Sequence, residues 1–325
     1  MVIRSLGKNS GVGYKAVWGR TGYGAALQWE PPKWYGERGC FGGGYTGSDT
    51  NVIEYVTIDT TGNGTDFGDL TQARQYITGA SNNTRGLWMG GANAGGTTYA
   101  ITDYITIGTL GNATDFGDPT VSRADGGGCS DGTYAIMGGG YDSTSWPTNG
   151  TNTIDYYTIA TTGNATDFGD LAVDGSSGAM YGVGGVSNGT LGVFGGGRNG
   201  GTRYSTIQYV TFDTLGNSAD VGNLTSARVS AAPMSNATRA VWAGGFTTNS
   251  YVDIMDYMDI ATSGSASDFG DLSAGRTSSS GCANATRGII YSGYTGSNTY
   301  INKIEYITIS TPGNSTTFGD PIPSQ

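Results

Sequence analysis

The chain has 325 residues, of which 59 are glycine, 21 are tyrosine and none is histidine, and its net charge is −10. The lack of histidine excludes Ser-His-Asp and Cys-His nucleophiles and metal sites that need imidazole ligands. With only 16 Lys and Arg residues, the chain has no basic footprint for nucleic acid. Its acidity also disfavours anionic membranes.

Three cysteines, Cys40, Cys129 and Cys282, stand far apart in the sequence. An odd number without a Cys-x-x-Cys pair predicts small buried side chains, with neither a disulfide framework nor a metal site. Met1–Asn9 has no apolar core of a signal peptide, and no run of 18 apolar residues is present to span a membrane. These features predict a chain made in a cytoplasm.

The first 23 residues form a basic segment on an acidic protein. An N-terminal arm of this composition suits docking onto another protein. The alternative is a segment that covers an edge, or plugs a channel, of the chain's own folded body. The candidate docking residues are Arg4, Lys8, Lys15, Trp18 and Arg20.

A unit of four short strands follows, and residues 72–120 show it most clearly. A first strand begins near Gln75, a second covers Arg85–Gly91, and Ile101–Ile107 alternates apolar and polar residues with the period of a strand. Gly111-Asn112 predicts a tight turn before a short last strand, Thr114–Asp118.

This unit recurs six times. Its marker, Asp-Phe-Gly-Asp or a degenerate copy, places Phe or Val at positions 67, 116, 168, 221, 269 and 318, in steps of 49, 52, 53, 48 and 49 residues. Such a period in an all-β chain predicts a six-bladed β-propeller over residues 24–325, with four antiparallel strands per blade. Gly24–Trp29 is the expected first strand of blade one. The expected blades are 24–71, 72–120, 121–172, 173–225, 226–273 and 274–325.

The order of features within each unit resembles that of Kelch-type propellers over residues 36–320. Each copy has a double glycine on strand two, as at Gly90-Gly91 (Ser292-Gly293 in the sixth), then a tyrosine strand, an aromatic strand and an arginine. Phenylalanine stands where that family has tryptophan. We expected the double glycines to let the inner strands crowd the axis. Some Kelch-type propellers are copper oxidases, which is excluded here because the chain has no histidine.

A narrower resemblance is to tandem-repeat virion proteins of tailed phages, above all phages of marine bacteria. It rests on Ile154–Leu171, which reads Ile-Asp-Tyr-Tyr-Thr-Ile-Ala-Thr-Thr-Gly-Asn-Ala-Thr-Asp-Phe-Gly-Asp-Leu, and on Trp34–Gly39. The resemblance implies a structural or tail-fibre component located in the virion. The arm would then contact other virion proteins, and virion context favours a symmetric homo-oligomer.

Several motifs look catalytic but recur with the repeat. Asp-Phe-Gly matches the kinase magnesium motif, yet it recurs in four of the six copies and no catalytic loop accompanies it. The glycine clusters lack the P-loop lysine, and the Asn-x-Thr strings follow from the turn chemistry. We therefore expect no enzyme activity and no cofactor, with the Phe residues filling the core between blades.

Acidic residues recur on strand three, at Glu54, Asp103, Asp155, Asp256 and Glu305, with Gln208 in blade four. A ring of carboxylates could hold Ca²⁺. We favour instead an internal polar network, in which these acids pair with the recurring arginines one strand away: Arg38, Arg85, Arg239 and Arg287.

The loops between strands two and three vary most in length and are rich in aromatic residues. A variable face on a rigid scaffold suits recognition, and Tyr and Trp offer large contact areas and stack on sugar rings. The alternative is that each aromatic packs on its own blade. The candidate binding residues are Tyr45, Tyr141, Trp146, Arg198, Phe246 and Tyr294.

Three functions remain open. The first is a phage virion protein, tail-fibre- or spike-associated, that contacts a glycan or protein receptor on the host, or a scaffold or decoration protein without that role. The second is a free binding module for a protein or polysaccharide. The third is an enzyme that uses carboxylates alone, for which Asp49, Asp142 and Asp174 are candidates.

Overall fold

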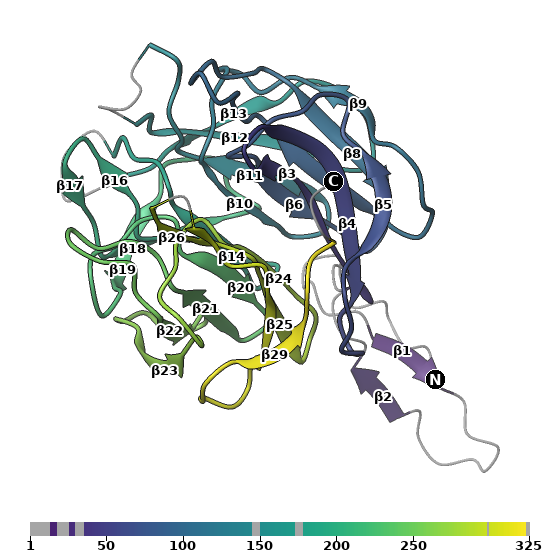
Figure 1. Cartoon of the computed structure of the whole chain (residues 1–325). Coiled ribbons are helices and arrows are strands. Elements are labelled where there is room, and N and C mark those ends of the chain that lie inside the picture. The colour runs from purple at the N-terminus through teal and green to yellow at the C-terminus, as the bar shows by residue number, and fades with distance from the viewer. Residues whose placement is uncertain are drawn as a thin grey trace.

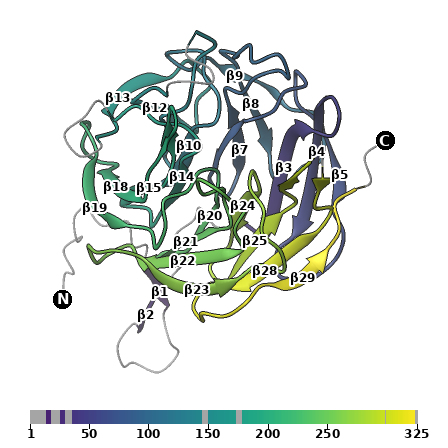
Figure 2. The same cartoon turned by 60° about the vertical axis from the view of Figure 1, so that its left-hand side comes forward.

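The computed structural model describes residues 14–17, 26–29, 36–144, 150–172, 178–297 and 299–322. The described residues contain strands and no helix. Six small antiparallel sheets stand around a common axis, as Figures 1 and 2 show. The predicted six-bladed β-propeller is therefore confirmed.

Five blades have four strands in consecutive antiparallel order from the axis outward, and blade 1 has three among the described residues. Blade 1 consists of β3 (Arg38–Tyr45), β4 (Asp49–Thr57) and β5 (Thr65–Asp69), blade 2 of β6 (Thr78–Ser81), β7 (Arg85–Met89), β8 (Thr102–Thr106) and β9 (Thr114–Gly117), and blade 3 of β10 (Gly127–Ser130), β11 (Tyr134–Gly138), β12 (Thr153–Thr158) and β13 (Thr166–Asp170). Blade 4 consists of β14 (Gly184–Ser187), β15 (Leu191–Gly195), β18 (Thr206–Thr211) and β19 (Ala219–Asn223), blade 5 of β20 (Ala232–Ser235), β21 (Arg239–Ala243), β22 (Ile254–Asp259) and β23 (Ser267–Asp271), and blade 6 of β24 (Ser280–Ala283), β25 (Arg287–Tyr291), β28 (Ile304–Thr308) and β29 (Thr316–Gly319).

Three two-stranded hairpins complete the described strands. Two of them are loops between strands two and three of blades 4 and 6, and the third precedes blade 1. They are β16 (Arg198–Asn199) with β17 (Thr202–Arg203), β26 (Tyr294–Gly296) with β27 (Thr299–Tyr300), and β1 (Tyr14–Val17) with β2 (Ala26–Trp29).

The expected first strand of blade 1, Gly24–Trp29, is wrong. Ala26–Trp29 pairs with Tyr14–Val17 and not with β3, and Figure 1 shows this hairpin outside the wheel. The physical reason is space, because inner strands lie so close that a Cβ atom at Gly128 would stand 2.2 Å from the Gly79 carbonyl oxygen. A strand that carries Leu and Trp does not suit that position.

The recurring phenylalanine fills the core between blades, as expected. Phe116 is 2% exposed, and its ring meets Tyr104 of the same blade edge to face at 5.6 Å and Tyr157 of the next blade at 5.7 Å. The same Tyr–Phe pair recurs in blades 1, 3, 5 and 6. Burial of each aromatic ring stabilises two blades at once.

The Gly-Asn turn links each outer strand to its neighbour. Gly111 N–H donates to the Phe67 carbonyl at 2.9 Å, and Asn112 Oδ1 accepts the Asp69 N–H at 3.0 Å. The last blade meets the first through the same bond, since Asn63 Oδ1 accepts the Asp320 N–H at 3.1 Å. The Asn-x-Thr strings thus have a structural role that closes the wheel.

The double glycines lie where strand two ends, not at the axis. Gly90 and Gly91 have φ values of +64° and +111°, and a Cβ atom at Gly90 would lie 2.2 Å from the Arg123 carbonyl oxygen. They are therefore needed for a left-handed turn against the linker of the next blade. Crowding at the axis falls instead on inner-strand glycines such as Gly128 and Gly185.

Four of the five strand-three acids form ion pairs, but with a different set of arginines from the expected one, while Glu54 accepts hydrogen bonds from the Tyr291 hydroxyl and the Ile322 N–H. Arg74 of the linker pairs with Asp103 at 2.9 Å, and both side chains are fully buried. Thr71 donates its backbone N–H and its hydroxyl to the same carboxylate. The equivalent pairs are Arg123–Asp155, Arg228–Asp256 and Arg276–Glu305.

The arginines expected in that role bind elsewhere. Arg85 lies over the Tyr104 ring at 4.8 Å and donates to the Ile159 carbonyl of the next blade at 2.8 Å. Strand two thus presents its arginine to the outer half of the blade, while the acid faces the linker. Arg38, Arg239 and Arg287 repeat both contacts.

Blade 4 replaces both members of the ion pair by neutral residues. Met180 takes the arginine position, because its carbonyl accepts the Gly140 N–H as the Arg123 carbonyl accepts that of Gly91. Gln208 takes the acid position, and its amide lies 3.7 Å from the Met180 sulfur. Losing one charge without the other would leave a buried, uncompensated ion.

We predict that Arg228→Met destabilises the protein by about 3–5 kcal/mol, because Asp256 would remain buried without its cation. The double variant Arg228→Met with Asp256→Gln copies the Met180–Gln208 pair of blade 4. It should recover most of the loss in urea unfolding. Equal destabilisation of the single and double variants would contradict this account.

Candidate functional site

A central cavity of about 1620 Å³ runs along the axis of the wheel. Its walls are the five inner strands and the face of β3 that turns toward the axis. The candidate site is the mouth of this cavity, which lies on the face where the linkers between blades enter the inner strands.

An arc of backbone hydrogen bonds lies along the mouth, and we call its residues the mouth ring. Each member precedes an inner strand by two residues and has a positive φ, between 53° and 67°. From the second member on, each N–H donates to the carbonyl of the preceding blade's member, at 2.7–3.0 Å. The members are Tyr76, Asp125, Gly182, Ser230 and Ser278.

Tyrosines gather on this mouth. The exposed aromatic side chains of the described residues are Tyr45, Tyr76 and Tyr300, which are 36%, 38% and 44% exposed, and all three line the cavity. Tyr294 lies beside Tyr300, with ring centroids 5.3 Å apart. We call Tyr45, Tyr76, Tyr294 and Tyr300 the tyrosine cluster.

Of the predicted binding residues, Tyr45 and Tyr294 belong to this cluster. Arg198 and Phe246 are half-buried, with Arg198 stacked on Tyr181 at 4.6 Å and Phe246 on Tyr251 at 4.7 Å. Tyr141 is 1% exposed and packs in a small core with Tyr181, so it cannot present its ring to a ligand at the surface. Trp146 lies outside the described residues.

The docking-arm candidates also fall outside what the structure describes. Arg4, Lys8, Trp18 and Arg20 are not among the described residues. Lys15 is placed only as a member of β1, where it pairs with Gln28. The arm remains a prediction.

Sequence reasoning missed Tyr76 and Tyr300. Tyr76 occupies a mouth-ring position that holds Asp, Gly or Ser in the other blades, so its departure from the repeat was the available signal. Tyr300 lies in β27, within the loop between strands two and three of the sixth copy. Loop length alone does not tell which residue of an insertion reaches the mouth.

Asp125 is the acid of the mouth ring. Burial raises the pKa of its carboxyl to about 6, and the positive charge of Arg198 only partly offsets this effect. Burial also raises the pKa of Tyr76 to about 12, with a further contribution from the Asp125 charge. The mouth therefore disfavours negative charge around Asp125 and Tyr76, and the Tyr76 hydroxyl remains a protonated donor at neutral pH.

The carboxylates proposed for an enzyme are engaged in local structure where the structure describes them. Asp49 Oδ2 accepts the Ala94 N–H at 2.8 Å, and Asp142 Oδ1 accepts the Thr144 N–H at 2.9 Å. Asp174 is not a described residue. Within the described ranges, no three His, Cys, Asp or Glu side chains gather as ligands for a metal ion.

Comparison with protein-family models and with curated proteins finds no match for this chain. No helix in the described part of the chain is long and apolar enough to cross a membrane. The site is therefore interpreted from its own residues.

We predict that Asp125→Asn changes the pH dependence of stability. Because the folded-state pKa of Asp125 is raised, its contribution is fully present below the unfolded pKa of about 3.8 and is lost as pH rises through about 6. Asparagine tolerates a positive φ and stays neutral. The variant should match the wild type at pH 4 and exceed its unfolding free energy by about 1–2 kcal/mol at pH 8.

Thermal and urea unfolding across this pH range would measure that difference. A constant gap between the two proteins from pH 4 to pH 8 would contradict the raised pKa. Asp142→Asn serves as a control, because that carboxylate lies in an exposed loop.

Proposed function

We propose that the protein is a non-enzymatic structural protein of a phage virion, associated with a tail fibre or spike, and that its propeller contacts the host surface. The observation that carries the binding part is the tyrosine cluster. The exposed aromatic rings of the described residues meet at one mouth instead of being scattered over the surface.

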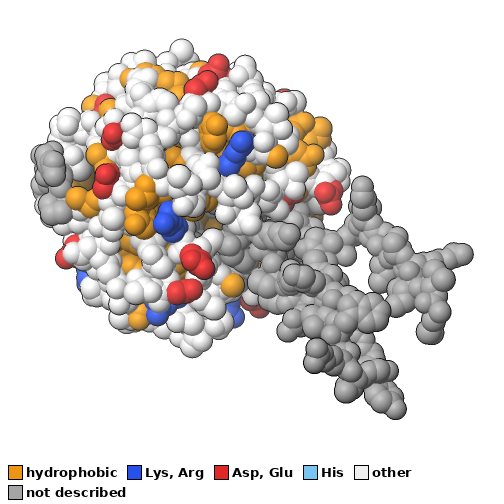
Figure 3. Space-filling view, turned by 90° about the vertical axis from the view of Figure 1, so that its right-hand side faces the viewer, with side chains coloured by type: hydrophobic (Ala, Val, Ile, Leu, Met, Phe, Trp, Pro, Cys, Tyr) orange, Lys and Arg blue, Asp and Glu red, His pale blue; other side chains and the backbone are white. Residues whose placement is uncertain are grey.

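The chemistry of this mouth fits a neutral or weakly polar ligand such as a surface glycan. Tyrosine rings stack on the apolar faces of sugars, and protonated hydroxyls donate hydrogen bonds to sugar oxygens. Figure 3 shows that charged side chains are sparse on one face of the molecule, where basic and acidic ones are mixed. Such a surface does not favour a strongly charged partner.

The virion assignment is supported by the repeat strings that resemble tandem-repeat phage proteins, such as Ile154–Leu171. We also infer that the blades are of Kelch type. The support is the order of double glycine, strand-three tyrosine, strand-four aromatic and linker arginine. Each of these occupies a repeated place in the wheel.

We predict that Tyr45→Ala with Tyr300→Ala weakens binding to host-envelope polysaccharide by about tenfold or more, because anchoring aromatics at an interface each contribute over about 1 kcal/mol. Leu215→Ala is the matched control, since Leu215 is 59% exposed but does not line the cavity. Binding to a glycan array and to envelope fractions measures the effect.

Unchanged binding in the double variant would refute the mouth as the recognition site. The virion part has its own test, which is mass spectrometry of purified particles. Presence of the chain without any host binding would favour a scaffold or decoration protein. Absence from particles would favour a free binding module.

A further inference from the structure

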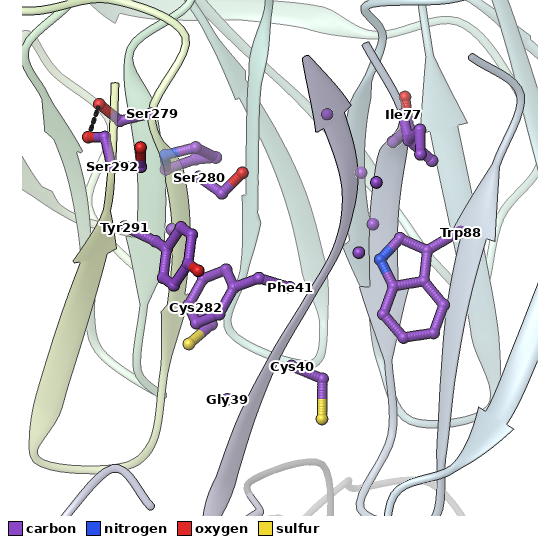
Figure 4. A pocket seen from close by; sticks show the side chains of 18 of the residues that line it. Gly39, Cys40, Phe41, Ile77, Trp88, Ser279, Ser280, Cys282, Tyr291 and Ser292 are labelled. Carbon is purple, nitrogen blue, oxygen red and sulfur yellow. Dashed lines mark hydrogen bonds between the residues drawn. The ribbon is translucent and has the colours of Figure 1, made fainter. Parts of the chain in front are cut away.

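Among the described residues, no strand lies at the inner position of blade 1 beside β3, and we call this position the strand slot. In the other five blades, strand two pairs with an inner strand on one side and with strand three on the other. Among the described residues β3 pairs only with β4. Gly39–Gly42, Trp88 and Cys282 line the central cavity here, and Figure 4 shows the space beside β3.

The surroundings of the strand-two glycines show which side chain is missing from the slot among the described residues. A Cβ atom at Gly39, Gly192 or Gly288 would stand 2.4–2.8 Å from a sulfur of the preceding blade's inner strand. Those sulfurs belong to Cys282, Cys129 and Met234, each at the third position of its strand.

Gly86 is the equivalent glycine of blade 2, and it has no such neighbour in the part of the chain that the structure describes. The nearest atom to its Cβ position is 3.5 Å away, on Ile105, and the other two belong to Ile105 and Ile107 of its own blade. The space beside Gly86 therefore suits an apolar side chain at the third position of a blade 1 inner strand.

Trp88 gives an independent indication. Trp242, at the same position in blade 5, donates its indole N–H to the Gly184 carbonyl of the preceding inner strand at 3.0 Å. Trp88 lines the cavity beside β3 (Figure 4), and among the described residues no inner strand of blade 1 offers it the equivalent carbonyl. An inner strand in blade 1 would supply that carbonyl.

The five inner strands define what the slot accepts. Their first and fourth residues are small, the second is glycine or proline, and the third is apolar or alanine. They read Thr-Gly-Ala-Ser, Gly-Gly-Cys-Ser, Gly-Gly-Val-Ser, Ala-Pro-Met-Ser and Ser-Gly-Cys-Ala.

The residues directly before β3 do not meet these requirements. At the spacing of the other blades, Pro31–Trp34 would enter the slot. Pro31 has no N–H to donate, and Lys33 would place its ammonium group against Ile105 and Ile107. Trp34 would need the space that serine or alanine fills elsewhere.

We propose that the slot binds the chain's own residues 10–13, Ser-Gly-Val-Gly, as the inner strand of blade 1. They match the pattern at all four positions, with Gly11 second and Val12 third, beside Gly86. The 35 residues before Gly36 supply the segment, and β1 begins at Tyr14, directly after it.

This assignment makes the β1–β2 hairpin an insertion between the inner strand and β3. Tyr14 pairs with Trp29, so the insertion leaves the blade and returns to it at neighbouring points. Lys8, two residues before Ser10, becomes the sixth member of the mouth ring. It stands between Ser278 and Tyr76.

Disulfide trapping in the full chain tests the proposal. In blades 3 and 6 the third residue of the inner strand pairs with the third residue of strand two, Cys129 with Ile136 and Cys282 with Ile289. In the same register, the third residue of an inner strand in blade 1 would lie opposite Cys40. Paired Cα atoms of antiparallel strands are about 4.5–5.5 Å apart, within the range of a disulfide. We expect Val12→Cys, in a Cys282→Ser background, to form an intrachain disulfide with Cys40 under mild oxidation.

Gly13→Cys in the same background is the matched control. Its side chain would face the opposite side of the strand, so it should cross-link at least tenfold more slowly, and Cys40→Ser should abolish the Val12→Cys product. Mass spectrometry identifies the linked peptides. Equal rates at both positions, or no disulfide, would overturn the proposal.

An interchain disulfide at Val12→Cys would also overturn it, because a second copy would then fill the slot. A stability measurement gives an independent readout. Val12→Glu would bury a charge beside Gly86 and should lower the melting temperature by several degrees, whereas Val2→Glu should not. Equal melting temperatures for the two variants would speak against the proposal.

Discussion

The close approach of the inner strands is the constraint on which the wheel depends. With Gly128 against the Gly79 carbonyl and Gly281 against that of Pro233, no room remains for side chains between these backbones. The inner strands therefore contact one another through their backbones and through hydrogen bonds. The apolar core lies further from the axis, in the layer of paired Tyr and Phe rings. Each blade buries its faces only because both neighbours are present.

Hydrogen bonds connect neighbouring blades at the mouth, in the middle of the blades and at the outer rim. At the mouth the mouth ring connects linkers, further out a strand-two arginine crosses to the next blade, and at the rim a turn asparagine does so. Arg287 to Ile58 and Asn63 to Asp320 carry these links from blade 6 to blade 1. The wheel thus closes by side-chain contacts between first and last blades.

The buried ion pairs hold the linker against its blade, but a neutral pair of side chains can do the same. Every carboxylate is fully hydrogen-bonded, which offsets part of its desolvation cost. Burial lowers the pKa of Arg228 and of Arg276. Blade 4 fills the same space with Met180 and Gln208, so shape and hydrogen bonding suffice when both partners change together.

Periodicity made the fold predictable, while pairing partners and departures from the repeat were not. The Phe spacing gave six blades because each marker fills the same core position. The Arg38-type and Arg74-type residues both recur, and sequence alone does not tell which reaches the acid of strand three. Gly24–Trp29 was misassigned because strand propensity was weighed without the space available at the axis. Tyr141 was misjudged because a loop aromatic can turn inward.

Several irregular features of the repeat lie together at the mouth, and this concentration supports the proposed function. Tyr76 replaces a small mouth-ring residue, Tyr300 comes from the β26–β27 hairpin of blade 6, and Tyr45 ends β3, which has no inner partner among the described residues. All three line the cavity that contains the strand slot. A strand in that slot would complete the mouth ring beside Tyr76 and support β3 beneath Tyr45. The completion of blade 1 and the shape of the proposed binding mouth would then depend on the same segment.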